Sequence, residues 1–272
     1  MSLPHITKKQ FEILTLIYSY RFINRIHIQT ILNHKNHRRI HAWLNDLGEK
    51  ECIGRIYSKK MPENTKPAVY FLGKYGRKIL QKHFSELKNK EGKNKPDKIA
   101  LYQLTKTYKD NQRTEVFRLS CLALVDISIT TTAYGIRERV HIAFRSLTEC
   151  AKTQLIEKFD SYVRVQKKNG KKKRYAFLYI SNRTPRRFIR YRIAEIIKLL
   201  DREWDSETDI PRPVVLCICS NFSIRNYACK IYETKMKYYK RTDKQVTFRL
   251  TTLHEYKTQG LGGSYWLLPK TP

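Results

Sequence analysis

The feature of this chain that most limits its fold is a charged segment at residues 85–98, where the apolar periodicity of the flanking sequence stops. Lysine, asparagine, glutamate, glycine and proline dominate this segment. Because such a composition offers no apolar face to bury, we predict a linker there. The linker separates an N-terminal domain at residues 1–84 from a C-terminal domain at residues 99–272. A hydrophobic fraction of 41% gives each domain enough apolar residues for a core.

Three helical patterns open the N-terminal domain. Thr7 and Gln10 have the spacing of a capping box, which predicts that the first helix begins there. Asn24 is placed to cap a second helix. The third pattern covers residues 37–47, and Gly48 follows it at the position where glycine commonly ends a helix.

Two alternating apolar segments, residues 53–57 and 68–72, follow the third helix and predict a pair of strands. Three helices, two strands and a final helix indicate a winged helix-turn-helix domain, whose third helix enters the major groove of duplex DNA. On that helix, Ile40, Trp43 and Leu44 lie on the predicted core face. The side chains predicted to meet phosphates or base edges lie on or just before the third helix and on the wing: Lys35, Arg38, Arg39, His41, Asn45, Lys59, Lys60 and Lys66.

The charge of the chain indicates its class of partner. Lysine and arginine number 55 against 24 aspartates and glutamates, a formal net charge of +31, whereas about 2 to 8 is usual for a small soluble domain. Such a charge favours a polyanion, and nucleic acid is the commonest polyanion in cells. We expect no membrane partner, because neither a long apolar run nor a lipidation motif is seen. Without an apolar signal core in the first ten residues, a cytoplasmic, nucleoid-associated protein is expected.

The C-terminal domain has a mixed α/β pattern. Strands at residues 161–166 and 175–181 are joined through Asn169 and Gly170, a strong hairpin signal. Pro185 then occupies the first position of a long predicted helix. The remaining predicted elements are helices near 112–124 and 142–157, a strand at 214–220, a helix at 223–239 and a strand at 246–250.

Residues 164–192 are the most basic part of the chain, with twelve lysines and arginines and no acidic residue. We expect the hairpin tip and the start of the following helix to present these residues as one surface that makes a second DNA contact. Arginines at a helix N-terminus oppose the helix dipole, and a bound phosphate would relieve that opposition. The predicted DNA-binding side chains are Lys167, Lys168, Lys171, Lys172, Lys173, Arg183, Arg186, Arg187 and Arg190.

The order of helices and strands in the C-terminal domain resembles the core of restriction-endonuclease-like folds. Short motifs along nearly the whole chain carry a second resemblance: Lys9-Gln10-Phe11-Glu12-Ile13-Leu14, Tyr70-Phe71-Leu72-Gly73-Lys74-Tyr75-Gly76-Arg77-Lys78-Ile79-Leu80, Thr114-Glu115-Val116-Phe117-Arg118, Phe159-Asp160, Thr251-Thr252-Leu253 and Gly262-Gly263-Ser264-Tyr265-Trp266. They are similar to motifs of the replication-relaxation proteins of plasmids and other mobile elements. The resemblance implies a role in replication, relaxation or transfer of mobile DNA, with replication, transfer or transposition proteins as further partners and without an agreed enzymatic activity.

The sequence departs from the family where nuclease chemistry would need acids. Family members usually carry a Glu-Val-Asp-like step on the central strand, and this chain has Tyr179-Ile180-Ser181 there. Nucleases of the restriction-endonuclease kind need clustered carboxylates to hold Mg²⁺ and a lysine to position the attacking water. Asp160 is present and Glu115 is a second candidate, but the central strand adds no acid. We therefore predict no catalytic residue, no metal, no cofactor and no enzymatic activity.

Three functions stay open on this evidence. The first is a non-catalytic protein that binds double-stranded DNA, and the second is a metal-dependent DNA nuclease that uses Asp160. The third is an RNA-binding regulator, because 18 tyrosines interleave with the basic residues and could stack on unpaired bases. A cleavage assay and competition between nucleic acids separate the three. The target site and the oligomeric state, including a homodimer, are left open by the sequence.

The six cysteines lie in apolar or helical stretches and are expected to be reduced thiols. Cys217 and Cys219 fall within a predicted buried strand. Because no second pair stands at zinc-site spacing, we predict no metal at these thiols.

Overall fold

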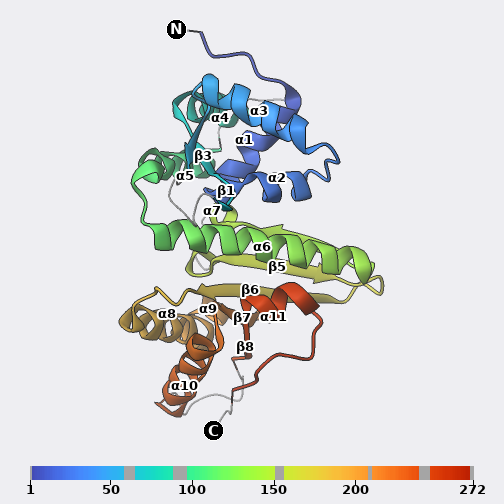
Figure 1. Ribbon diagram of the computed structural model, residues 1–272. Coiled ribbons are helices and arrows are strands. Elements are labelled where there is room, and N and C mark those ends of the chain that lie inside the picture. The colour runs from blue at the N-terminus through green and yellow to red at the C-terminus, as the bar shows by residue number, and fades with distance from the viewer. Residues whose placement is uncertain are drawn as a thin grey trace. The chain divides into compact units, whose positions relative to one another are not determined.

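The computed structural model describes residues 2–57, 65–87, 97–150, 156–207, 210–238 and 246–269. Helices and two separate β-sheets make it an α+β chain (Figure 1). The chain divides into two compact units, Met1–Val125 and Asp126–Pro272. This division falls inside the long helix α6, Glu115–Arg137, and differs from the predicted division at residues 85–98, of which 88–96 lie outside the described residues.

The helices of the N-terminal unit begin where the sequence predicted. The predicted capping box of Thr7 and Gln10 is formed at the start of the first helix, and Asn24 caps the second. Asn36 caps the third. The helices in the described part of this unit before α6 are α1 (Lys8–Tyr20), α2 (Arg25–Ile31), α3 (His37–Glu49), α4 (Lys74–Ser85), α5 (Lys98–Thr105) and the 3₁₀-helix η2 (Lys106–Gln112).

The C-terminal end of α3 differs from the prediction. The helix continues through Gly48 to Glu49, and the left-handed residue beyond it is Glu51, with a φ of 50°. The backbone N–H groups of Glu51 and Cys52 donate to the carbonyl oxygens of Gly48 and Leu47 at 2.9 and 2.8 Å. Because these bonds satisfy the last carbonyls of the helix, its end does not depend on the glycine.

A small three-stranded antiparallel sheet lies in the same unit. Its strands are β1 (Ile23–Asn24), β2 (Ile53–Ile56) and β3 (Val69–Leu72). The central strand is β3, so the order is β1-β3-β2. The last two strands match the predicted segments at 53–57 and 68–72 to within about a residue at each end.

Residues beyond the predicted linker pack against the first helix, which explains where the unit ends. The hydroxyl of Tyr18 donates to the carbonyl oxygen of Ala100 at 3.1 Å, in a buried contact. The rings of Phe22 and Phe117 meet edge to face with centroids 6.0 Å apart. These contacts join α5 to α1, and the start of α6 to the residues just after α1, so the N-terminal unit is longer than the predicted domain.

The C-terminal unit is built on a five-stranded mixed sheet of order β4-β5-β6-β7-β8. The pairs β4–β5 and β5–β6 are antiparallel, and β6–β7 and β7–β8 are parallel. The elements are β4 (His141–Arg145), α7 (Leu147–Cys150), η3 (Ile156–Lys158), β5 (Ser161–Gln166), β6 (Lys172–Ile180), α8 (Arg186–Lys198), η4 (Leu199–Glu203), α9 (Trp204–Glu207), β7 (Val214–Cys219), α10 (Phe222–Tyr238), β8 (Phe248–Thr252) and α11 (Leu253–Gln259).

The helix predicted near residues 142–157 is wrong at its start, where the structure has strand β4. Ile142 and Phe144 alternate with small or charged residues and face Val165 and Val163 across the antiparallel pair. The period of two allows these half-buried side chains to cover the edge of the sheet. A short helix, α7, does follow, while residues 151–155 lie outside the described residues.

Helices cover both faces of this sheet (Figure 1). On one face, Ile193 of α8 and Tyr232 of α10 belong to an apolar core with Leu178 of β6. On the other face, Tyr256 of α11 meets Phe177 of β6 edge to face, with ring centroids 5.8 Å apart. The side chains of β6 therefore alternate between two buried layers, as expected for a central strand.

By length and composition, α6 is the one described helix that could cross a membrane. Its contacts within the C-terminal unit are those of a packed helix. The hydroxyl groups of Thr131 and Tyr256 share a buried hydrogen bond of 2.7 Å, and Lys257 donates to Asp126 at 3.0 Å. Both bonds join α6 to α11.

Candidate nucleic-acid interface

Helix α3 has one buried face and one exposed basic face. Ile40, Leu44 and Leu47 are buried against the N-terminal unit. The predicted DNA-contacting side chains on the opposite face and just before the helix are all exposed. They are Lys35, Arg38, Arg39, His41 and Asn45.

The polar face of α3 is partly ordered by its own contacts. The side-chain amide of Asn45 lies 3.2 Å from Nδ1 of His41, one helical turn away. The guanidinium of Arg39 lies over the ring of Trp43, 5.6 Å from its centroid, so half-buried Trp43 also supports the exposed face. Neither Arg38 nor Arg39 forms an ion pair within the described parts of the chain, which leaves both charges available to an external anion.

The predicted wing is described only in part. Lys66 is exposed and precedes β3, as predicted. Lys59 and Lys60 lie outside the described residues.

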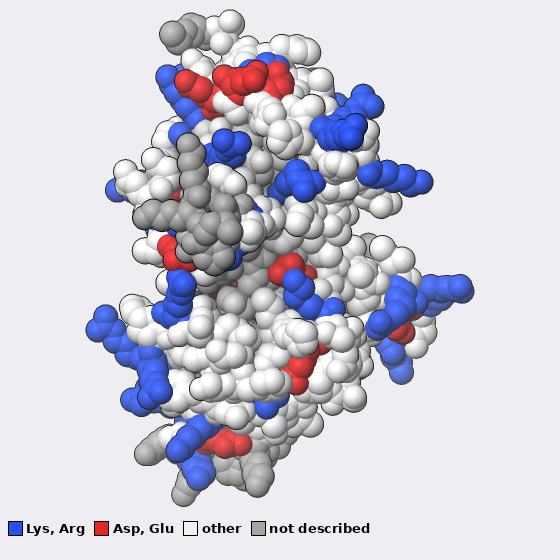
Figure 2. Space-filling view, viewed as in Figure 1, with Lys and Arg blue, Asp and Glu red and all other residues white. Residues whose placement is uncertain are grey.

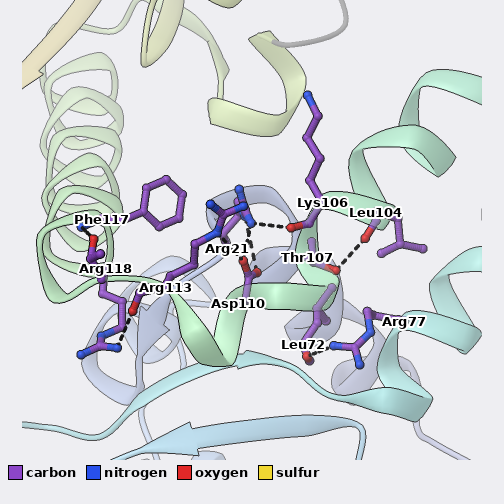
Figure 3. Close-up of polar contacts among 11 residues, drawn as sticks. Arg21, Leu72, Arg77, Leu104, Lys106, Thr107, Asp110, Arg113, Phe117 and Arg118 are labelled. Carbon is purple, nitrogen blue, oxygen red and sulfur yellow. Dashed lines mark hydrogen bonds and ion pairs between the residues drawn. The ribbon is translucent and has the colours of Figure 1, made fainter. Parts of the chain in front are cut away.

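A buried ion pair fixes the end of α1 to η2 (Figure 3). Arg21, with a φ of 65°, leaves the helix and directs its guanidinium to the carboxylate of Asp110 and, at 2.8 Å, to the carbonyl oxygen of Lys106. Asp110 is 1% exposed. Burial raises the pKa of Asp110, while the hydrogen bond and charge of Arg21 oppose that shift.

Phe117 adds a residue of α6 to this cluster. The guanidinium groups of Arg21 and Arg113 lie 4.9 and 5.3 Å from the centroid of its ring. The cluster is thus a structural support of the N-terminal unit, and no periodicity in the sequence indicated that residues 21 and 110 would pair.

The predicted hairpin of the C-terminal unit is present between β5 and β6. Gly170 adopts a φ of 77°, and the N–H of Lys167 donates to the carbonyl oxygen of Lys171 at 3.0 Å. The lysines at this tip are all exposed. They are Lys167, Lys168, Lys171, Lys172 and Lys173.

The arginines of the same basic segment lie elsewhere, which corrects the prediction of one surface. Arg183, Arg186, Arg187 and Arg190 are exposed around the start of α8, which follows the far end of β6. A nine-residue strand separates the two groups, and at about 3.3 Å per residue this is roughly 30 Å. Figure 2 shows basic side chains gathered at the hairpin end and, separately, over α8.

Arg186 and Arg190 of α8 instead share a groove with α10, which sequence reasoning missed. The groove has a volume of about 560 Å³. Its α10 residues follow a helical spacing of three and four, the signal that could have identified them as one face. The lining residues are Arg186, Arg190, Tyr227, Lys230, Ile231, Thr234 and Lys235.

Asp160, the candidate nuclease acid, is engaged in the structure of the sheet. One carboxylate oxygen accepts the backbone N–H of Tyr179 at 2.7 Å, and the other accepts Nη2 of Arg192 at 2.9 Å. Glu115, the second candidate, begins α6 in the N-terminal unit. Within the described residues, no three His, Cys, Asp or Glu side chains are grouped so as to hold a metal ion.

The six cysteines are free and buried. Cys217 and Cys219 lie side by side on β7 with their sulfur atoms 3.8 Å apart. Burial raises the pKa of Cys52 and Cys229 to about 11 and raises that of Cys217 as well. A raised pKa disfavours the thiolate, the form of cysteine that acts as nucleophile.

No protein-family model, curated protein or solved structure matches this chain.

Proposed function

We propose that this chain binds double-stranded DNA through α3 and has no catalytic activity. The observation that carries the proposal is the exposed face of α3, where Arg38 and Arg39 stand without acidic partners within the described residues. Opposite them, a buried apolar face fixes the helix to its unit. A helix held in this way can enter a major groove as a rigid element.

The proposed architecture of the N-terminal unit is a winged helix-turn-helix. Its element order α1-β1-α2-α3-β2-β3 and its sheet order β1-β3-β2 support this assignment. In such a domain the second and third helices form the helix-turn-helix, and the last two strands form the wing beside the DNA. Lys66 would then contact phosphates next to the groove that α3 occupies.

Two kinds of contact are expected from α3. Arg38 and Arg39 supply charge to the phosphates, which gives affinity without sequence preference. Asn45 and His41 offer amide and imidazole groups that can recognise base edges, as asparagine does with adenine.

For the C-terminal unit we propose a restriction-endonuclease-like core without nuclease chemistry. The mixed sheet, with its antiparallel β4-β5-β6 part and parallel β7, supports the resemblance. The absence of catalysis is supported by Asp160, whose two oxygens already bind Tyr179 and Arg192. A guanidinium next to that carboxylate would repel a divalent cation.

The proposed biological role follows the resemblance to replication-relaxation proteins. We infer a mobile-element protein that acts in replication, transfer or transcriptional control in the cytoplasm, at the nucleoid. Selection of binding sites from random duplexes, followed by footprinting on the DNA that encodes the protein, tests this role. Protection of a discrete site supports it, whereas binding without any sequence or structural preference counts against it.

A further inference from the structure

We propose that the groove between α8 and α10 binds unpaired nucleotides of a single-stranded nucleic acid. This site lies in the C-terminal unit and goes beyond duplex binding by α3. It does not rest on that function, because its evidence comes entirely from residues 186–235.

The charge of the groove requires an anionic occupant. Four of its lining side chains are cationic, and no aspartate or glutamate is among them: the cations are Arg186, Arg190, Lys230 and Lys235. Like charges gathered in one concave site repel one another until an anion neutralises them. A chain of phosphodiesters supplies such charge at regular spacing.

Both arginines are held in place by one tyrosine. Nε of Arg190 donates to the hydroxyl of Tyr227 at 2.9 Å. The guanidinium of Arg186 lies over the ring of the same residue, 5.2 Å from its centroid. Because their positions are set before binding, less side-chain freedom is lost when they meet a phosphate. Tyr227 is thus a positioning residue for the two arginines.

The shape of the groove favours unpaired nucleotides over a duplex. Tyr227 and Ile231 give the groove an apolar part between its basic side chains. Its volume of about 560 Å³ lies within the range of about 300 to 1,000 Å³ typical of small-ligand clefts. A duplex keeps its bases stacked inside and would offer only phosphates to such a groove. A flexible strand can place a base against the tyrosine or a guanidinium plane.

Two exposed aromatic rings also lie on α8, outside the residues that line the groove. Phe188 and Tyr191 are 49% and 61% exposed, and both lie among the arginines of the helix start. The guanidinium of Arg187 lies 5.3 Å from the centroid of the Phe188 ring. Exposed aromatic rings and guanidinium planes are groups on which unpaired bases stack.

The test measures binding of the full chain to a fluorescein-labelled oligothymidylate of about 12 nucleotides, a length in the range that single-strand-binding folds cover. The variants are Arg186→Ala with Arg190→Ala, and Tyr227→Phe, which keeps the ring and removes the hydroxyl. Lys198→Ala with Arg202→Ala is the control, because it removes the same number of cations from exposed side chains farther along the same helical segment, where they pair with Glu203 and Asp201. Circular dichroism and thermal unfolding establish that each variant is folded.

We expect the double arginine variant to bind the strand about tenfold more weakly or worse. The slope of its salt dependence should become shallower by about 1.4, at roughly 0.7 for each phosphate that the variant no longer neutralises. Tyr227→Phe should weaken binding to a lesser degree, and the control should match the unaltered chain. The affinity for a labelled oligouridylate is compared with that for the oligothymidylate to determine whether the preferred strand is RNA or DNA, since the chemistry of the groove fits either.

Several results would overturn the proposal. One is unchanged affinity of the double arginine variant, and another is an equal loss in the control. If thymidine monophosphate competes with the labelled strand as well as an unlabelled oligonucleotide does at equal nucleotide concentration, the groove is a free-nucleotide site. If polyglutamate displaces the labelled strand and unlabelled oligonucleotides do not, the partner is an acidic protein. Duplex binding is measured in parallel with Arg38→Glu and Arg39→Glu, so that a failure of the groove and a failure of α3 give different patterns.

Discussion

At the residue scale, Asp110 shows how one buried contact supports the N-terminal unit. It accepts the guanidinium of Arg21 and is almost wholly removed from solvent. Asp110→Asn keeps the shape of the side chain but leaves the arginine buried without a counter-charge. We expect the free energy of unfolding of this unit to fall by about 3 kcal/mol, as for other broken buried pairs. Urea unfolding measures the change.

The matched control for Asp110 is Glu12→Gln, which breaks the exposed pair between Glu12 and Lys9. Exposed pairs of this kind contribute less than about 1 kcal/mol. A loss for Asp110→Asn no larger than that of the control would contradict a supporting role for the buried pair.

In the proposed complex with DNA, His41 and Asn45 are the residue pair that we expect to select the sequence. Since their side chains lie within hydrogen-bonding distance, each orients the other, and their effects should not add. Replacing either with alanine should broaden the preferred sequence while leaving the salt dependence nearly unchanged. Binding-site selection with both single variants and the double variant measures this. Equal sequence preference in all four proteins would mean that α3 recognises only phosphates or DNA shape.

At the element scale, the contacts of α5 and η2 predict how the N-terminal unit can be truncated. A fragment ending at Glu86 loses Ala100 and Asp110, the partners of Tyr18 and Arg21. We expect it to unfold at a lower temperature than a fragment ending at Val125, because a buried arginine and a buried hydroxyl lose their hydrogen bonds. Thermal unfolding followed by circular dichroism compares them. Equal midpoints would show that the unit ends before the segment at residues 85–98.

The elements also show what the sequence can and cannot predict. Local patterns located the helix starts and the hairpin. The reason is that a capping residue such as Thr7 or Asn24, or a turn such as Asn169-Gly170, acts through residues that neighbour it in the sequence. Strand β4 was mistaken for a helix because its pairing with β5 is a distant contact. The basic groove was missed for a similar reason, since its arginines lie on α8 and its lysines on α10. The basic residues of 164–192 are close together in the sequence, but they do not form one cluster in space, because β6 separates the hairpin tip from α8.

At the scale of the whole molecule, the chain is expected to bind nucleic acid without cutting it. The two oxygens of Asp160 hold Tyr179 and Arg192, so a catalytic metal would have to displace a guanidinium. We expect the purified protein to leave supercoiled plasmid and linear DNA intact with Mg²⁺ or Mn²⁺ present. Gel electrophoresis over a range of protein concentrations measures this. Metal-dependent cleavage that disappears in Asp160→Ala would contradict it and restore the nuclease hypothesis.

The central claim is that α3 carries duplex recognition, and charge reversal on that helix tests it most directly. In a mobility-shift assay on a selected duplex, Arg38→Glu with Arg39→Glu should weaken binding by about two orders of magnitude, because both charges act close to the phosphates. The control, Lys78→Glu with Lys82→Glu, reverses two exposed charges on α4 of the same unit. With both variants folded, a large loss confined to the α3 variant is the predicted result. Unchanged duplex affinity in the α3 variant, or an equal loss in both, would contradict the account.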